Sequence, residues 1–317
     1  MSCTYFVQAQ FDPQFSQNMF NIPAINPAAI ASDSSFTVYG IMRQQWVGIK
    51  RAPRTTVVNL NAPFMTFDRS QHAAGFMYIN DRAGFFLSQM IYGQYAYRFK
   101  LRKGGVLSFG TTVGILNQTI DPEDARTLES IISGGTTTGG GDYVMPSGAS
   151  DNAFLTSKGN GIAFDWHLGA FYADAKMYVG ASAQHITKAA RRVDENISYD
   201  TKTTTYFTAG YNFSLANPLY VLKPSVFVKT DFASYQIDAD MLVEYGNRYW
   251  GGAGYRLDDA LTFIVGMRLA NGLRISYSYD WTISKLAAVS DGSHEIMLSY
   301  SLKQDKKRTK YKSIRIL

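Results

Sequence analysis

Histidine and cysteine are the residues whose chemistry a sequence reveals most directly. The chain of 317 residues has four histidines, His72, His167, His185 and His294, and one cysteine, Cys3. No two histidines have H-x-x-x-H or H-E-x-x-H spacing, and one cysteine cannot form a disulfide or a cysteine-based metal site within a chain. We therefore predict no metal site, no cofactor and no catalytic residue.

One group of residues has the composition of a hydrolytic site. His185 precedes Arg191, Asp194 and Glu195, and a histidine with acidic neighbours can act as a general base. A histidine beside a solvated, charged loop is the simpler interpretation, so we predict that the protein is not an enzyme. The run GGTTTGGG at 134–141 lacks the Gly-Lys-Ser/Thr of a phosphate-binding loop.

The segments that contain these histidines show the two-residue hydrophobic period of β-strands. From 35 to 302, apolar residues alternate with polar or small ones in runs of about ten, as where Phe263, Val265 and Met267 alternate with Ile264 and Gly266. Strands of ~9–11 residues cross a bilayer when tilted, whereas soluble sheets use ~5–6. No run approaches the ~18 consecutive apolar residues of a membrane-spanning helix.

The second face of these strands carries charged groups that a dry protein core would not accept, among them Asp165, Asp238, Arg256, Asp280 and Glu295. A barrel interior accepts them. We predict an all-β fold, a transmembrane antiparallel β-barrel of about 14 strands over 35–302, located in the bacterial outer membrane. Near-equal acids and bases favour a filled or plugged lumen over an ion-selective pore. Pro224 is the weakest point, since proline in a strand requires a bulge or an interrupted ladder.

The connections and the two ends of the chain complete the predicted topology. Long connections at 42–53, 118–159, 187–202 and 284–293 alternate with short turns, and an even strand number then puts both termini in the periplasm. A helix is expected within 121–135, because Asp121 can cap it and Pro122 suits its first turn. Residues 1–9 are interpreted as the possible remnant of a signal peptide, and 10–34 as a periplasmic N-terminal segment.

The net charge of +6 is concentrated in residues 303–317, so the rest of the chain is balanced. A DNA-binding domain carries its basic surface on folded elements, so we predict no nucleic-acid partner. We expect the tail to be periplasmic, where it can meet an acidic partner or anionic envelope polymers. Its central basic residues are Lys306, Lys307, Arg308, Lys310 and Lys312.

Several short motifs at both ends of the barrel carry a family resemblance. They comprise Asp12-Pro13-Gln14-Phe15-Ser16-Gln17, Met19-Phe20-Asn21, Asn26-Pro27-Ala28, Gln45-Trp46-Val47-Gly48, Ala52-Pro53-Arg54-Thr55 and Ser293-His294-Glu295-Ile296-Met297-Leu298. In this order they resemble the PorP/SprF family of type IX secretion membrane proteins of Bacteroidetes. The candidate partner-binding residues are Asp12, Pro13, Gln14, Phe15, Ser16, Gln17, Phe20, Asn21, Asn26, Pro27, Gln45, Trp46, Gly48 and Pro53.

The resemblance implies an outer-membrane component of type IX protein secretion and gliding motility. Expected partners are ring lipoproteins of the machine, a peptidoglycan-binding lipoprotein, or the C-terminal domains of secreted cargo, with outer-membrane lipid around the barrel. The loops at 118–159 and around Trp46 are candidate cargo surfaces. The first alternative is a diffusion pore or a FadL-like transport channel, and the second is a barrel hydrolase.

Overall fold

The structure is a computed structural model that describes residues 12–32, 35–66, 71–102, 104–120, 159–187, 190–194 and 197–302, with the backbone alone described at 190–194 and 197–200. The signal remnant, the expected helix within 121–135 and the basic tail lie outside the described residues. No helix among the described residues is long and apolar enough to span a membrane.

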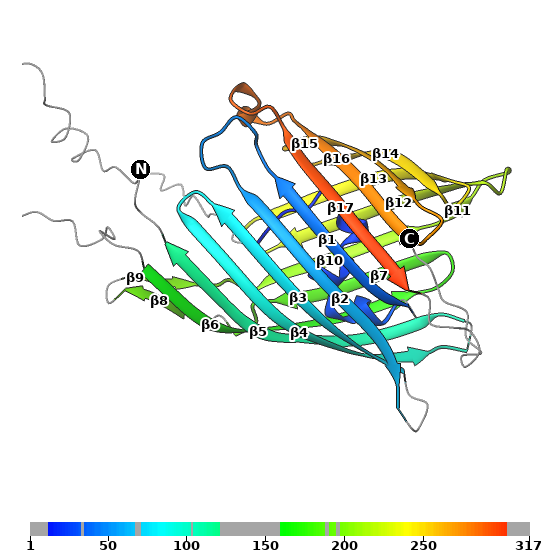
Figure 1. The fold of residues 1–317 in the computed structure, drawn as a ribbon, viewed down its shortest axis with the longest axis horizontal. Helices are drawn as coiled ribbons and strands as arrows, with labels where there is room; N and C mark the ends of the chain where they lie inside the picture. Colours follow the sequence, from blue (N-terminus) through cyan, green and yellow to red (C-terminus); the bar gives the residue numbers. More distant parts are fainter. Residues whose placement is uncertain are drawn as a thin grey trace, which may run out of the picture.

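Fourteen antiparallel strands form a closed barrel (Figure 1), which confirms the predicted fold. They are β1 (Phe36–Gln44), β2 (Arg54–Met65), β3 (Gln71–Ala83), β4 (Phe86–Lys100), β5 (Val106–Ile120), β6 (Gly159–Ala173), β7 (Met177–Gln184), β10 (Thr204–Tyr211) continued by β11 (Phe213–Ser214), β12 (Tyr220–Thr230), β13 (Tyr235–Tyr245), β14 (Tyr249–Arg256), β15 (Ala260–Arg268), β16 (Leu273–Thr282) and β17 (Ser293–Leu302). β1 pairs with β17, and β10 pairs with both β7 and β12, so the sheet closes on itself. A separate hairpin joins β8 (Ala190–Asp194) and β9 (Ile197–Asp200).

The two faces of the strands divide as the alternation predicts. In β15, the outward side chains of Phe263 and Val265 are 46% and 58% exposed, whereas Thr262 and Ile264 are buried. Side chains at i and i+2 share a face of a strand, so each strand gives one apolar side to lipid and one side to the lumen. The charged residues Asp165, Asp238, Arg256, Asp280 and Glu295 are all buried on the inner side.

Pro224 is accommodated by an interrupted ladder. Residues of β12 pair with β10 up to Gly210↔Ser225, and pairing resumes with β11 at Phe213↔Leu222. The register with β13 stays continuous through Pro224↔Met241. The missing N–H therefore falls beside the gap between β10 and β11, and no bulge in the register is needed.

The connections sort onto two ends of the barrel. Connections 45–53, 185–203 and 283–292 share one end, here termed the loop end, and the short turns 174–176, 246–248 and 269–272 share the opposite, or turn, end. β1 begins and β17 finishes at the turn end. The predicted alternation of long and short connections is thus observed at these positions.

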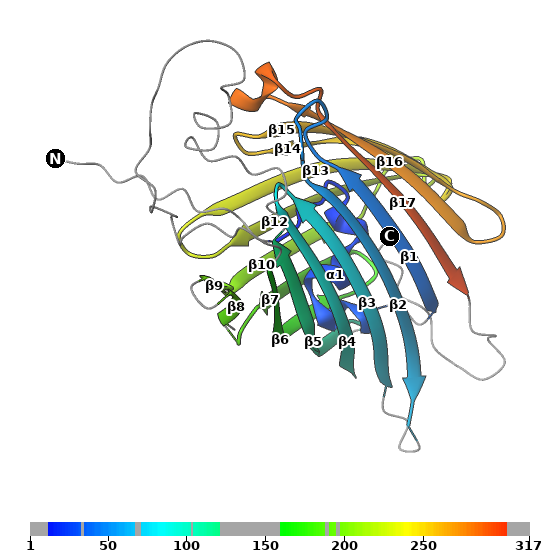
Figure 2. The same ribbon diagram turned by 60° about the vertical axis from the view of Figure 1, so that its left-hand side comes forward.

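Residues 12–32, termed the plug, lie inside the barrel (Figure 2). The plug consists of three short turns of helix, η1 (Asn18–Phe20), α1 (Ile22–Ile25) and η2 (Pro27–Ala31). Proline at the start of α1 and of η2 fixes the backbone for a helical turn, and the Asn26 side chain caps η2 by accepting from the Ala28 N–H at 3.0 Å.

The plug crosses the lumen from end to end. Asp12 contacts residues at the loop end, and Ala31 packs with Ala73 and Ala96 near the turn end. Asp12 and Leu302, the first and last described residues, lie at opposite ends of the barrel. The periplasmic location of the two termini stays a prediction, since residues 1–11 and 303–317 lie outside the described part of the chain. The motif residues of the plug are mostly buried against the wall, so they do not form a free surface for partners.

Candidate functional site

The plug is held at the loop end by the buried carboxylate of Asp12. His185 Nε2 lies 2.7 Å from Asp12 Oδ1, the Tyr206 hydroxyl donates to Oδ2 at 2.8 Å, and Lys229 Nζ donates to the Asp12 carbonyl oxygen at 2.8 Å. Two hydrogen-bond donors, His185 and Tyr206, and the ammonium group of Lys229 offset the cost of burying the Asp12 carboxylate. Asp12 therefore ties the start of the plug to β10, β12 and the end of β7.

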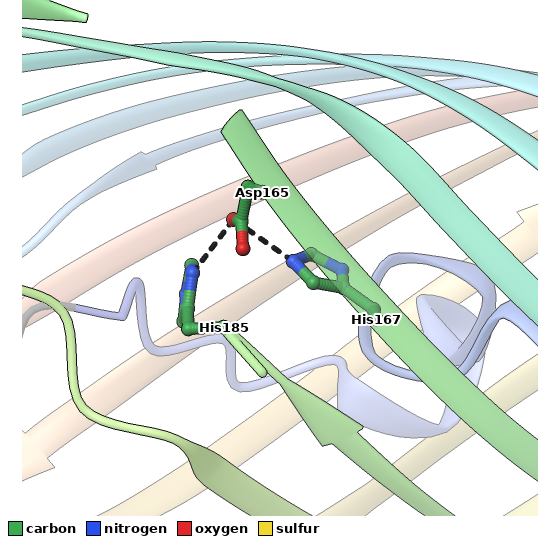
Figure 3. Close-up of side chains that lie close together, drawn as sticks. All are labelled: Asp165, His167 and His185. Atoms are coloured by element: carbon green, nitrogen blue, oxygen red, sulfur yellow. Dashed lines mark hydrogen bonds and ion pairs between the residues drawn. The ribbon is translucent and has the colours of Figure 1, made fainter. Parts of the chain in front are cut away.

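His185 also belongs to a cluster of metal-ligand residue types (Figure 3). Asp165 Oδ2 lies 3.0 Å from His167 Nε2 and 2.7 Å from His185 Nδ1, and the Tyr92 hydroxyl donates to the same oxygen at 2.6 Å. His167 and His185 lack a metal-site spacing in the sequence, but they come together because β6 and β7 are neighbouring strands, and their ring centroids lie 5.2 Å apart. His185 directly follows β7 at the loop end, as expected of a histidine beside that loop, but its side chain is buried between two carboxylates.

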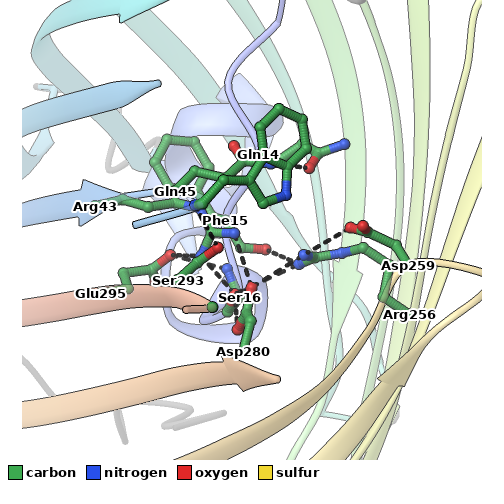
Figure 4. Close-up of polar contacts among 12 residues, drawn as sticks. Gln14, Phe15, Ser16, Arg43, Gln45, Arg256, Asp259, Asp280, Ser293 and Glu295 are labelled. Carbon is green, nitrogen blue, oxygen red and sulfur yellow. Dashed lines mark hydrogen bonds and ion pairs between the residues drawn. The ribbon is translucent and has the colours of Figure 1, made fainter. Parts of the chain in front are cut away.

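A second polar cluster surrounds Ser16 (Figure 4). Arg43 donates to Ser16 Oγ at 2.6 Å and to Asp280 Oδ2 at 2.8 Å. The Ser16 hydroxyl donates to Asp280 Oδ1 at 2.6 Å, and the Ser16 N–H donates to Glu295 Oε2 at 2.9 Å. Buried charges are costly unless paired, and here the Ser16 hydroxyl and amide complete the pairing of Arg43 with two acids.

Neighbouring plug residues extend this cluster. Arg256 pairs with Asp238 and Asp280 at 3.2 and 3.1 Å and donates to the carbonyl oxygen of Phe15 at 3.2 Å. The Gln17 N–H donates to Glu295 Oε1 at 3.0 Å, and the Gln17 side chain accepts from Ser276. The charged residues of β1, β13, β14, β16 and β17 thus converge on the plug.

The middle of the plug packs against the wall through apolar contacts. Met19 forms one cluster with Leu242, Trp250 and Ile264, and the Phe20 ring lies 5.5 Å from that of Trp250. Asn21 is fully buried at the start of α1. The inward face here is apolar because it meets protein, whereas an aqueous channel would require polar groups.

Asn26 and Pro27 fit into a recess made by glycines of three adjacent strands. Asn26 Nδ2 donates to the carbonyl oxygens of Ala170 and Ala181 at 2.9 and 3.2 Å. A Cβ added at Gly110 would lie 2.4 Å from the Ala28 nitrogen and from the Pro27 carbonyl carbon. At Gly169 and Gly180 it would meet the Asn26 side-chain amide at 2.1 and 2.9 Å. Glycine is required where another backbone approaches this closely.

The Gln-Trp-x-Gly motif fixes the 45–53 loop against its neighbour. Gln45 Nε2 donates to Gln14 Oε1 at 3.0 Å, and the Trp46 N–H donates to Ser293 Oγ at 3.1 Å. Gly48 has a φ of +97° and lies against the 283–292 loop. The Pro53 carbonyl accepts from the Gln45 N–H at 2.9 Å, and Pro13 is half-buried.

Two charged residues of these clusters, Arg43 and Lys229, were not among the inner-face charges identified from the sequence. Arg43 shares the inner face of β1 with Tyr39 and Ile41, so the strand has an apolar inner side with no charge pattern. Lys229 is buried in β12 beneath Asp12. The signal that could identify both is the unusual placement of a charge on the buried side of a strand. The basic residues Lys306 to Lys312 lie outside the described part of the chain.

A closed barrel with an apolar outer belt and a charged, plugged lumen defines an outer-membrane β-barrel protein. The family model for type IX secretion system membrane protein PorP/SprF matches residues 7–300. The chain therefore belongs to the PorP/SprF family and is an outer-membrane component of this secretion system, which confirms the resemblance identified in the motifs.

Curated protein sequences give no match to the chain. Among solved structures, a deltaS2S3 mutant of the monoaromatic hydrocarbon channel TodX is 11% identical and covers 87% of this chain and 92% of its own, with a TM-score of 0.47. The translocator domain of the autotransporter NalP from Neisseria meningitidis is 13% identical, covering 91% and 96%, with a TM-score of 0.47. The toluene transporter TbuX from Ralstonia pickettii is 11% identical, covering 88% and 92%, with a TM-score of 0.46. Identities this low transfer no function.

Proposed function

We propose that the protein acts as a non-enzymatic, plugged anchor of the secretion machinery that binds ring lipoproteins, a peptidoglycan-binding lipoprotein or the C-terminal domains of cargo. This proposal rests on the contacts of the family-motif residues, which hold the plug in the barrel. Asp12 to Gln17, Asn26 and Gln45 serve to bind the plug to the barrel wall. Residues used in this way maintain a rigid, closed scaffold on which loops and termini can bind partners.

Exposed apolar side chains at the loop end support a binding role for that end. Phe232 and Val289 are 82% and 62% exposed in loops, outside the strand faces that contact lipid. The Arg51 guanidinium lies 4.4 Å above the ring of Phe85 in the same region. Apolar and arginine side chains held on a rigid rim are typical of protein-binding surfaces.

The state of the buried acid–base groups favours a non-catalytic role. Asp12, Asp165 and His185 are buried and oriented toward one another. A general base needs access to a substrate proton, and within the described residues these side chains face protein groups instead. If the protein were a hydrolase with His185 as its base, changing His185 to alanine should abolish a measurable hydrolytic activity.

The main alternative, a diffusion pore or FadL-like channel, is tested by planar-bilayer conductance. We expect the purified protein to show no stable open conductance, because the plug packs against the wall along its length. A cavity of about 110 Å³ between plug and wall, lined in part by Arg274, Ser276 and Trp250, is small beside ligand pockets of ~300–1,000 Å³. A stable open pore that retains no partner would overturn the proposal.

Affinity isolation from native membranes tests partner binding. Truncation of 303–317 should release a ring component while the barrel stays heat-modifiable on gels. A matched variant that keeps the length and replaces Lys306, Lys307, Arg308, Lys310 and Lys312 by glutamine separates charge from length. Retention of the same partners by both variants would refute the role of the tail, and recovery of no secretion component with the intact chain would refute the anchor.

A further inference from the structure

Asp165, His167 and His185 form a buried cluster of ionisable side chains for which the anchoring proposal gives no role. Candidate ligand atoms of the three side chains lie within 4.8 Å of one another. The residues are between 2% and 4% exposed. Asp165 and His167 are two positions apart on the inner face of β6, and His185 directly follows the neighbouring strand β7, where a φ of +56° accompanies its inward-facing ring.

Both ring nitrogens of His185 lie close to carboxylate oxygens. Nε2 lies 2.7 Å from Asp12 Oδ1, so this nitrogen carries a proton that it donates to the carboxylate. Nδ1 lies 2.7 Å from Asp165 Oδ2, yet among the described residues it has no partner with hydrogen-bond geometry. In a neutral imidazole this nitrogen would present a lone pair to a carboxylate oxygen, which is repulsive. A positive centre at Nδ1 removes the repulsion, and either a proton or a metal ion can supply it.

We propose that Asp165, His167 and His185 bind one divalent transition-metal ion, for which Zn²⁺ is the best match, and that the Asp12 carboxylate orients His185. Two imidazole nitrogens and a carboxylate are a common three-ligand set for zinc, with water in the fourth position. Zinc–ligand bonds of ~2.0–2.1 Å put tetrahedral ligand atoms ~3.3 Å apart. The observed separations of 3.0 and 2.7 Å from the Asp165 oxygen therefore need small outward movements, whereas the two imidazole nitrogens, which lie within 4.8 Å of each other, need to come to the same spacing (Figure 3).

The second contact of His185 matches the usual environment of a metal-bound histidine. Such a histidine donates its other N–H to a carboxylate, which fixes the ring orientation. Asp12 occupies this position and belongs to the plug. The ion would connect β6, the end of β7 and the plug at one point, so metal binding would fasten the plug at the loop end.

Metal titration of the chelator-treated, detergent-solubilised full chain tests the proposal. Calorimetry with Zn²⁺ should show one ion per chain, and Co²⁺ should give the visible absorption of a nitrogen- and oxygen-liganded site. His167→Gln should weaken Zn²⁺ affinity by more than ~100-fold, and Asp12→Asn by ~10–100-fold. The matched control, His72→Gln with His294→Gln, should keep full affinity, because these histidines contact Tyr95 and Tyr277 outside the cluster.

Each outcome decides for or against the site. The proposal would be overturned by absence of Zn²⁺ binding to the intact chain, by unchanged affinity after His167→Gln, or by loss of affinity in the control variant. If the intact chain binds no metal, a proton on His185 Nδ1 is the positive centre. Heat-modifiability on gels checks that each variant folds. If His167→Gln fails to fold, zinc-edge X-ray absorption of the intact protein decides, since two imidazoles are expected in the first shell and a shell of oxygens alone refutes the proposal.

Discussion

Replacing Gly110 with alanine tests the fit between the plug and the barrel wall. The added Cβ would lie 2.4 Å from the Ala28 nitrogen and 2.6 Å from the Pro27 carbonyl oxygen, where ordinary contacts begin at 3.4 Å. Both are backbone atoms, so the plug or β5 must retreat by about 1 Å. Overpacking costs ~1–3 kcal/mol, and the upper half of this range applies because the atoms in the way are backbone. Alanine gains ~0.5–1 kcal/mol over glycine in a strand, so we expect a net loss of ~1–2.5 kcal/mol, a ~5–70-fold change in the ratio of folded to unfolded protein.

Denaturant unfolding in detergent micelles measures this loss, and limited proteolysis of the plug locates it. The matched control is Gly93→Ala in β4, where the nearest atom to an added Cβ is the Val113 carbonyl oxygen at 3.9 Å. The control should keep or slightly raise stability, and its plug should stay protected. Equal stability of the two variants, with equal protection of the plug, would refute the close packing of Pro27 and Ala28 on β5.

Three further predictions use the same unfolding assay. Arg43→Met leaves Asp280 and Glu295 buried without their partner and should lower the free energy of unfolding by ~3–5 kcal/mol. Adding Glu295→Gln should restore part of this loss, and no recovery would argue against the Arg43–Glu295 pair. Asn26→Ala removes two hydrogen bonds to wall carbonyls and should cost ~1–3 kcal/mol with faster proteolysis of the plug, whereas unchanged proteolysis would contradict the anchoring of η2. Val265→Arg places a charge on the lipid face and should cost ~2–4 kcal/mol, while Phe232→Arg in an exposed loop should cost little; equal effects would contradict the membrane belt.

The strands and the closure of the barrel could be predicted from the sequence because their signal is local. The alternation of Phe263 and Val265 with Thr262 and Ile264 sets the two faces without knowledge of any distant residue. Bilayer thickness then constrains strand length, which is why the predicted number of strands over 35–302 agrees with the observed barrel. The even strand number follows from the alternation of long and short connections.

The plug could not be predicted, because its stability comes from distant contacts. Its helical turns are too short to have a period, and its polar composition is typical of an exposed segment. Ser16 is buried with partners far away in the sequence, such as Glu295, which lies 279 residues away and accepts its N–H. The approach of His167 to His185 was missed for a related reason, since no fixed spacing describes neighbouring strands of variable length. Composition did predict a filled lumen, which the plug confirms for the described residues, but it did not indicate what fills it.

The position of the motifs connects plug insertion with closure of the barrel. Arg43 and Glu295 are directly paired across β1 and β17, the first and last strands. Both side chains bind Ser16, and Glu295 also accepts from the Gln17 N–H. Without the plug, the two charges would still pair, but Glu295 would lose the N–H donors of both residues inside a poorly solvated lumen, which is costly. The two processes should therefore be coupled, because motif residues from both ends of the chain, Ser16 and Glu295, meet at the β1–β17 seam where the barrel closes.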